Sequence, residues 1–311
     1  MEDIRKTIGI IKSQNFSWVN VAKTGKKQME FLKKKFDFLD LDLNDCLPPL
    51  QRPKLMIREN YLFMILNFPI YDKKTKMIKS AEIDFFIGKN FLITVHNDYF
   101  EHFKNFEDKH LSGLKSKKEL FKNQGNLLYQ VLESLIEPVF PMLNNISLDI
   151  EHVEKRVLDP DEPKSIHDIL IIKRNIANFR KIMLGHKAVI RKLIASAPPF
   201  FPTAKINNFF NNLVEQTKDV WDTLENYKET IDALHQTKES IHGYRLNDIM
   251  KTLTLFSILL LPLTLLASIF GMNTVSSMPF IKNNFGFWLV ISLMFIEMVV
   301  MFIFFKKKRW L

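Results

Sequence analysis

The chain has 311 residues, is 47% hydrophobic and 25% charged, and carries a formal net charge of +10. This composition excludes a fully disordered protein, because it provides enough apolar side chains for a core. The single cysteine, Cys46, excludes an intrachain disulfide framework and a zinc or iron–sulfur site built from several thiolates. We expect Cys46 to be buried as a small apolar residue.

Residues 1–100 alternate short apolar runs with turn-forming residues. Three runs rich in aromatic and β-branched residues predict strands: Tyr61–Ile70, Glu82–Ile87 and Phe91–His96. The Gly-Lys-Asn sequence between the last two runs indicates a hairpin. Met1–Lys6 lacks the apolar stretch of a signal peptide. We therefore expect a small α/β domain, at residues 1–120, that stays in the cytosol.

From about Glu101 the apolar pattern becomes helical. Proline-containing stretches interrupt it at 159–163 and 198–202, so two long helices are expected before the second break and a longer one after it. The pattern predicts a cytosolic region of long helices over residues 121–247 and an all-α membrane domain over residues 248–311.

The helix after the second break carries an apolar seam in which spacings of 3 and 4 alternate, as in a coiled coil. The seam consists of Ile206, Phe210, Leu213, Thr217, Val220, Leu224, Tyr227, Ile231, Leu234, Lys238 and Ile241. No proline follows Pro202 until Pro262, so the helix is expected to run from about Thr203 into the membrane, over about 100 Å. The seam packs either within its own domain or as a stalk against copies of itself; the continuity favours the stalk.

Two segments are long and apolar enough to cross a bilayer, at about 253–270 and 285–305. The linker between them contains one basic residue, Lys282, whereas the second segment is followed by Lys306, Lys307, Lys308 and Arg309. Because basic residues favour the cytosolic side, both termini are expected in the cytosol, with the spans in the cell membrane.

One stripe of the first span could line water, because its members recur at spacings of 3 or 4 and carry no charge. The stripe consists of Asn247, Met250, Thr254, Ser257, Leu261, Thr264 and Ser268. Small hydroxyl residues also serve ordinary helix packing in membranes, so the stripe alone does not decide between the two roles. Two helices cannot enclose a pore, so conduction would need several copies of the chain.

The segment Phe270-Gly271-Met272-Asn273 lies at the end of this span, in a two-span chain with a basic C-terminal tail. In this position it resembles the Gly-Met-Asn signature of the CorA family of divalent-cation channels. Residues 51–54 (Gln-Arg-Pro-Lys) and 59–61 (Glu-Asn-Tyr) match the family's cytosolic domain as well. The resemblance implies a homopentamer with a funnel-shaped α/β cytosolic domain and a central pore lined by the first span.

Mg²⁺ sheds its water reluctantly, so a fast pathway should bind the hydrated ion through hydrogen-bond acceptors. Gly271, Met272 and Asn273 would form the selectivity filter, with a ring of Asn273 carbonyls; Gly271 is also expected to cap the helix in the left-handed conformation. Further inside, Met250, Leu253 and Leu261 would be the apolar collar, Thr264 a polar ring and Asn247 an inner polar ring.

The family holds its channels closed with Mg²⁺ bound between acidic residues of neighbouring cytosolic domains. Asp45 falls where one of these carboxylates is expected, and equally fits an ordinary turn aspartate. The partner position holds the amide Asn212 in place of an acid, and Glu215 one turn later is the nearest carboxylate on this helix. In the second span, Glu297 is expected to be protonated or to hydrogen-bond Ser257 or Thr264 in a structural role.

The sequence contains no phosphate-binding, dinucleotide-binding or zinc-protease motif, so no enzyme is predicted. The scattered lysines favour a solvated face near anionic lipid over nucleic-acid binding. We predict a passive Mg²⁺ influx channel that also passes Co²⁺ or Ni²⁺, as its relatives do. The alternatives are a zinc transporter of the same superfamily and a two-span signalling or scaffold protein.

Overall fold

The computed structural model describes residues 7–13, 16–97, 103–104, 106, 123–158, 164–201, 207–272, 279, 284–308 and 310. The chain divides into two compact units, Met1–Thr237 and Lys238–Leu311. Helix α10 (Asn207–Phe270) begins in the first unit and ends in the second. It is unbroken over 64 residues, which confirms the predicted continuity; residues 203–206 lie outside the described residues.

The first unit contains a six-stranded sheet in the order β1-β2-β6-β5-β4-β3. The strands are β1 (Ile8–Lys12), β2 (Ser17–Val21), β3 (Lys54–Ile57), β4 (Tyr61–Asp72), β5 (Met77–Gly88) and β6 (Phe91–His96). Within this sheet β2 and β6 pair in parallel, and the other neighbours pair antiparallel. Strands β4 to β6 confirm the three predicted runs and their hairpin, whereas the sequence pattern did not identify β1, β2 and β3.

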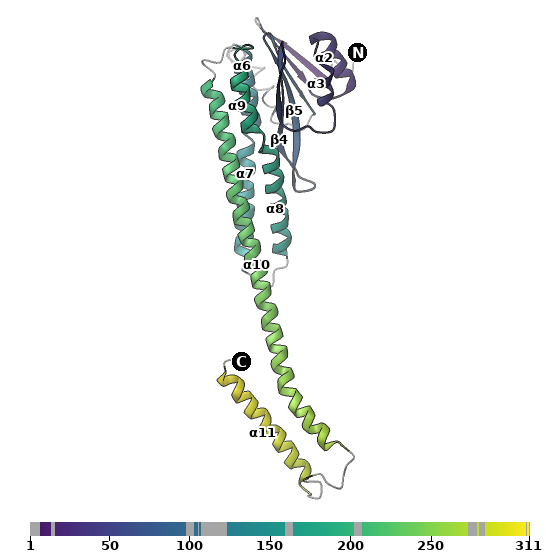
Figure 1. The fold of residues 1–311 in the computed structure, drawn as a ribbon, viewed down its shortest axis with the longest axis vertical. Helices are drawn as coiled ribbons and strands as arrows, with labels where there is room; N and C mark the ends of the chain where they lie inside the picture. Colours follow the sequence, from purple (N-terminus) through teal and green to yellow (C-terminus); the bar gives the residue numbers. More distant parts are fainter. Residues whose placement is uncertain are drawn as a thin grey trace. The chain divides into compact units, whose positions relative to one another are not determined.

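Helices cover both faces of this sheet (Figure 1). On β4, Leu62 and Met64 belong to a core shared with α6 (Gln124–Ile136) and α9 (His186–Ser196). Phe63 and Ile65 point to the other face and belong to a core shared with α2 (Lys26–Phe36) and α3 (Asp40–Asp45). Cys46 is buried in this second core, as expected. The near-continuous apolar run of β4 follows from burial on both faces.

Among the described residues after Glu101, four helices, rather than the two expected, precede the second break: α6, α7 (Val139–Val157), α8 (Lys164–Met183) and α9. Pro138 separates α6 from α7, because its ring nitrogen has no proton to continue the helical hydrogen bonds. Gly185 separates α8 from α9, and a Cβ at this glycine would lie 2.6 Å from the Pro53 Cβ. The chain therefore needs a residue without a side chain at Gly185, and glycine is a poor helix former.

The seam of α10 packs against α7 and α8 in a third core. Val220, Leu224 and Ile231 are buried there, and a salt bridge of 2.7 Å between Lys173 and Asp232 links α8 to α10. The expectation of a stalk packed against copies of itself is therefore wrong from Phe210 to Ile231, because neighbouring helices of the same chain already cover this part. From His242 to Thr254, by contrast, every side chain of α10 is exposed.

The second unit contains the end of α10 and helix α11 (Gly286–Lys307). Both have the length and composition of membrane spans, and their most apolar windows are 6% and 0% buried. Such exposure is unlike the core helix of a soluble protein, so the two predicted spans are confirmed as candidate membrane helices. One stripe of each helix is partly buried: Leu255, Leu259, Leu263, Leu266 and Phe270 on α10, and Val290, Met294, Glu297, Met301 and Phe305 on α11.

Candidate functional site

The residues predicted to line a pore lie on one exposed face of α10. Asn247, Met250, Leu253, Ser257, Leu261, Thr264 and Ser268 are all exposed. The partly buried stripe of α10, which includes Leu259 and Leu266, lies on the opposite side of the helix. The uncharged face is therefore not used for packing within the unit, and it is available to face a shared axis.

The hydroxyl groups on this face donate their protons to the helix itself. Ser257 Oγ donates to the Leu253 carbonyl oxygen at 2.9 Å, and Thr264 Oγ1 donates to the Leu261 carbonyl oxygen at 2.8 Å. Thr254 Oγ1 donates in the same way to the Met250 carbonyl oxygen at 2.7 Å. Because a hydroxyl has one proton and two lone pairs, each oxygen presents acceptor capacity outward. A cation that keeps its water needs such acceptors for its water protons.

The predicted filter begins where α10 ends. The Gly271 N–H donates to the Ala267 carbonyl oxygen at 2.9 Å, and the Met272 N–H donates to the Ile269 carbonyl oxygen at 3.3 Å. The expectation of a left-handed Gly271 is wrong, since none of the described glycines has a positive φ. Instead, a Cβ at Gly271 would lie only 3.1 Å from the Ala267 oxygen. Asn273 lies outside the described residues.

Glu297 lies on the partly buried stripe of α11. Its Oε2 atom is buried, without a hydrogen-bond partner among the described residues. The expected hydrogen bond between Glu297 Oε2 and Ser257 or Thr264 is therefore absent from the described part of the chain. Both hydroxyl protons are already bonded to backbone carbonyls, so neither group can donate to the carboxylate.

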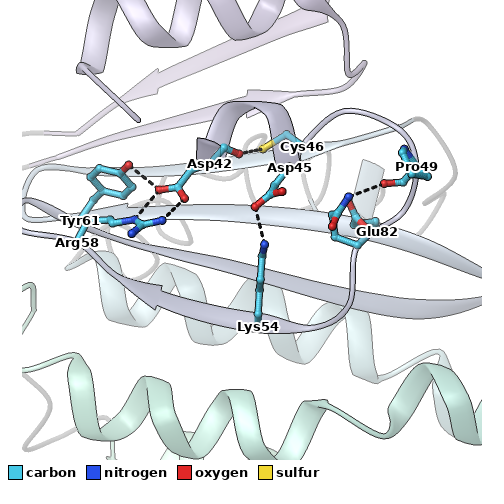
Figure 2. Close-up of polar contacts among 9 residues, drawn as sticks. Asp42, Asp45, Cys46, Pro49, Lys54, Arg58, Tyr61 and Glu82 are labelled. Carbon is cyan, nitrogen blue, oxygen red and sulfur yellow. Dashed lines mark hydrogen bonds and ion pairs between the residues drawn. The ribbon is translucent and has the colours of Figure 1, made fainter. Parts of the chain in front are cut away.

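Asp45 is the last residue of α3, and its carboxylate is paired with a lysine (Figure 2). Lys54 Nζ, on β3, donates to Asp45 Oδ2 at 2.5 Å. The side chains of Asp45 and Lys54 are 19% and 33% exposed, so water screens the pair only in part. A divalent cation at Asp45 would have to compete with this ammonium group.

Two acids of β5 lie beside this pair. Glu82 accepts a hydrogen bond from the Gln51 backbone N–H, and burial raises the pKa of Glu82 to about 7. Asp84 is fully buried, and burial followed by repulsion from Glu82 raises the pKa of Asp84 well above its usual range. Burial and the neighbouring Asp84 also raise the pKa of the Cys46 thiol. The cluster therefore favours protonated acids and an inert thiol near Asp45.

A second ion pair anchors the other end of α3 (Figure 2). The Arg58 guanidinium binds both oxygens of buried Asp42, through Nε to Oδ2 at 2.9 Å and Nη2 to Oδ1 at 2.5 Å. The Tyr61 hydroxyl donates to Asp42 Oδ2 at 2.7 Å. Mainly because of burial, the pKa of Tyr61 rises to about 12. These contacts fix the short helix that carries Asp45.

The other candidate regulatory residues lie on α10. Asn212 and Glu215 are both exposed. Among the described residues, no three His, Cys, Asp or Glu side chains are grouped so that they could hold a metal ion. A site that uses Asp45 and Glu215 would therefore need further ligands from water or from another copy of the chain.

A family model described as CorA-like Mg²⁺ transporter protein matches residues 13–307. The chain belongs to this family. The cobalt/magnesium transport protein CorA of Thermotoga maritima is 26% identical over 99% of this chain and 87% of the relative. The CorA magnesium transporter structure from Methanocaldococcus jannaschii has a TM-score of 0.82 at 22% identity and covers 97% of this chain and 93% of its own. The ZntB cytoplasmic domain of Vibrio parahaemolyticus has a TM-score of 0.62 at 14% identity, covering 76% of this chain and 90% of its own.

The chain is thus a CorA-family divalent-cation transporter with the CorA fold. Sequence reasoning missed the pairing of Lys54 with Asp45 and the buried acids Glu82 and Asp84. The two acids could have been found from the sequence, because both lie within the run Glu82–Ile87 that predicts a strand. Side chains two residues apart in a strand point to the same face, so a strand here places Glu82 and Asp84 together. No local sequence pattern indicated the ion pair between Lys54 and Asp45, because α3 and β3 come together only in the folded domain.

Proposed function

We propose that this chain is one subunit of a passive Mg²⁺ influx channel in the cell membrane, with both termini in the cytosol. The observation that supports the proposal is the uncharged, exposed face of α10, whose hydroxyl oxygens at Ser257 and Thr264 present lone pairs outward. Several copies around one axis, five in the pentamer that the family resemblance implies, would arrange these oxygens in rings.

Rings of neutral acceptors suit a hydrated Mg²⁺ ion. Stripping its water is costly, and a carboxylate ring would bind the ion too tightly for rapid release. Gly271, Met272 and Asn273 form the entrance filter in this proposal, and Asn247 forms a polar ring about 39 Å further along the helix. Met250, Leu253 and Leu261 form the apolar collar between them, which closes by losing its water.

The membrane potential supplies the driving force. A divalent ion gains roughly 4.6 kcal/mol per 100 mV on entering a negatively charged interior. No chemical step or resident cofactor is needed. Mg²⁺ bound at Asp45 and Glu215 of neighbouring subunits closes the channel in this proposal, in competition with Lys54.

Transport of Co²⁺ or Ni²⁺ belongs to the same proposal. The name of the Thermotoga maritima relative includes cobalt, which supports this breadth. A zinc transporter is the second candidate within the superfamily, and Met272 in the signature favours Mg²⁺ over it. A two-span scaffold is disfavoured by the family match along most of the chain.

The proposal is tested by ion uptake into liposomes that contain the purified full-length protein. Uptake of Mg²⁺, Co²⁺, Ni²⁺ and Zn²⁺ is measured separately, with an imposed inside-negative potential and with the potential dissipated. We expect potential-driven Mg²⁺ uptake that Asn273→Ala abolishes without changing assembly. Selective Zn²⁺ uptake would support the zinc transporter, and no uptake of any of these ions by an assembled protein would support the scaffold.

A further inference from the structure

A groove of about 310 Å³ lies on the flank of α10, between the uncharged face and the partly buried stripe. It is lined by Lys251, Thr254, Leu255, Ile258 and Trp310. All five residues belong to the second unit. A space of this size holds about ten water molecules, so it is too large for a single ion and suits part of an organic molecule.

Trp310 is held in the groove by contacts with α11. Its backbone N–H donates to the Phe305 carbonyl oxygen at 3.0 Å, which turns the chain back after the helix. The Trp310 and Phe305 rings stack, with centroids 6.1 Å apart and an interplanar angle of 19°. Phe305 itself is 2% exposed. The indole wall of the groove is therefore fixed by a buried ring.

The groove changes from basic to apolar along its length. Lys251 lies at one end, and Ile258 lies two turns further, about 10 Å deeper into the apolar segment. Exposed Lys306, Lys307 and Lys308 end α11 on the same side of the span as Trp310. The acid near Lys251 on α10 is the exposed Asp248, so the basic groups outnumber it.

We propose that this groove binds one anionic phospholipid. Its phosphate lies against the Lys251 ammonium and the lysines at the end of α11, and one acyl chain lies along Leu255 and Ile258 against the Trp310 ring. Charge complementarity selects the anionic head group, and the apolar depth of the groove selects a molecule with a chain over a free phosphate. Tryptophan suits the boundary between the two environments.

The test counts lipids bound to the full-length assembled protein by native mass spectrometry, with phosphatidylglycerol or phosphatidylcholine added. Wild-type protein is expected to prefer phosphatidylglycerol, and Lys251→Gln is expected to weaken its binding about fivefold, the equivalent of roughly 1 kcal/mol for one lysine near a membrane surface. Lys218→Gln, an exposed lysine of α10 in the first unit, is the matched control and should change nothing.

A second variant tests the apolar part of the groove. Ile258→Trp should fill it and abolish the tightly bound lipid, whereas Leu260→Trp, on the same helix and outside the groove, should not. In vesicles, brominated phosphatidylglycerol should quench a component of the tryptophan emission that Trp310→Phe removes. This fluorescence measurement does not depend on the behaviour of the groove variants.

Several results would overturn the proposal. They are equal binding of the two lipids, an unchanged lipid count in Ile258→Trp, absence of Trp310 quenching, and displacement of the lipid by glycerol phosphate at equal concentration. Cross-linking of Ile258→Cys to a neighbouring subunit in the assembled protein would show that another copy fills the groove, and would overturn it too. Ion transport is not the readout, so failure here is distinguishable from failure of the channel proposal.

Discussion

The Lys54 ammonium lies 2.5 Å from the Asp45 carboxylate, at the position where the family resemblance implies a Mg²⁺-binding acid. An internal cation thus occupies a place that a regulatory Mg²⁺ would take. This relationship leads to a prediction that the sequence motif alone does not provide: the affinity of the sensing site depends on a lysine of the same chain.

Lys54→Gln should make the channel close at a lower internal Mg²⁺ concentration. A partly exposed ion pair contributes up to about 1 kcal/mol, so the half-closing concentration should fall by up to about fivefold. The measurement is Mg²⁺ uptake into liposomes loaded with increasing Mg²⁺. Lys33→Gln removes a more exposed ion pair, with Asp40, and serves as the control. Identical closing curves for wild type and Lys54→Gln would remove Asp45 from the sensing site.

The stability of the protein should fall as the pH rises from about 4.5 to above 7. The pKa of Glu82 is raised to about 7 in the folded chain, so the folded state holds a proton that the unfolded state has already lost across this window. Glu82→Gln should therefore reduce the loss of stability between pH 5 and pH 8, by about 1–2 kcal/mol after allowance for solvent screening. Asp84 acts in the same direction and leaves a residual slope.

Denaturant midpoints of the full chain at pH 5 and pH 8 measure this effect. Asp72→Asn is the control, because the Lys79 hydrogen bond lowers the pKa of Asp72 and its titration ends below this window. A pH dependence that is as steep in Glu82→Gln as in wild type would show that Glu82 is ionised throughout.

Glu297→Gln should leave Mg²⁺ uptake unchanged. Glu297 lies on the partly buried stripe of α11, whereas the proposed ion path follows the exposed face of α10. Glutamine keeps the size of the side chain and removes its charge, so assembly should persist. Uptake by reconstituted Glu297→Gln is the measurement, and its loss in a normally assembled protein would place the carboxyl group on the ion path.

The sequence predicted the parts of the fold that local patterns determine. The apolar runs at Tyr61–Ile70 and Phe91–His96 correspond to strands, and the proline-free stretch before Pro262 corresponds to one unbroken helix. The partner of the α10 seam could not be read from its spacing, because the same spacing of 3 and 4 suits a neighbouring helix of the same chain. Likewise, the pairing of Asp45 with Lys54 depends on how α3 and β3 meet in the folded domain.

The candidate ion path was predictable in position but not in its hydrogen bonding. Spacing placed Ser257 and Thr264 on one face of the helix, and the structure keeps that face exposed. The two hydroxyl protons point to the backbone carbonyl oxygens of Leu253 and Leu261. The hydroxyl oxygens are therefore left as acceptors on the exposed face. The expectation of a left-handed Gly271 was wrong for a related reason. The Gly271 N–H donates to the Ala267 carbonyl oxygen, so helical hydrogen bonding continues as far as Gly271.

The most direct test of the account compares two substitutions of threonine by valine on α10. Thr264→Val removes an acceptor from the uncharged face that is proposed to line the pore. Thr252→Val removes a hydroxyl from another side of the helix, where it likewise donates to a backbone oxygen, that of Asp248, at 2.9 Å. We predict that Mg²⁺ uptake by purified protein in liposomes falls at least about tenfold in Thr264→Val, the equivalent of 1.4 kcal/mol, and stays at the wild-type level in Thr252→Val. Equal uptake by the two variants, with normal assembly of both, would contradict the account.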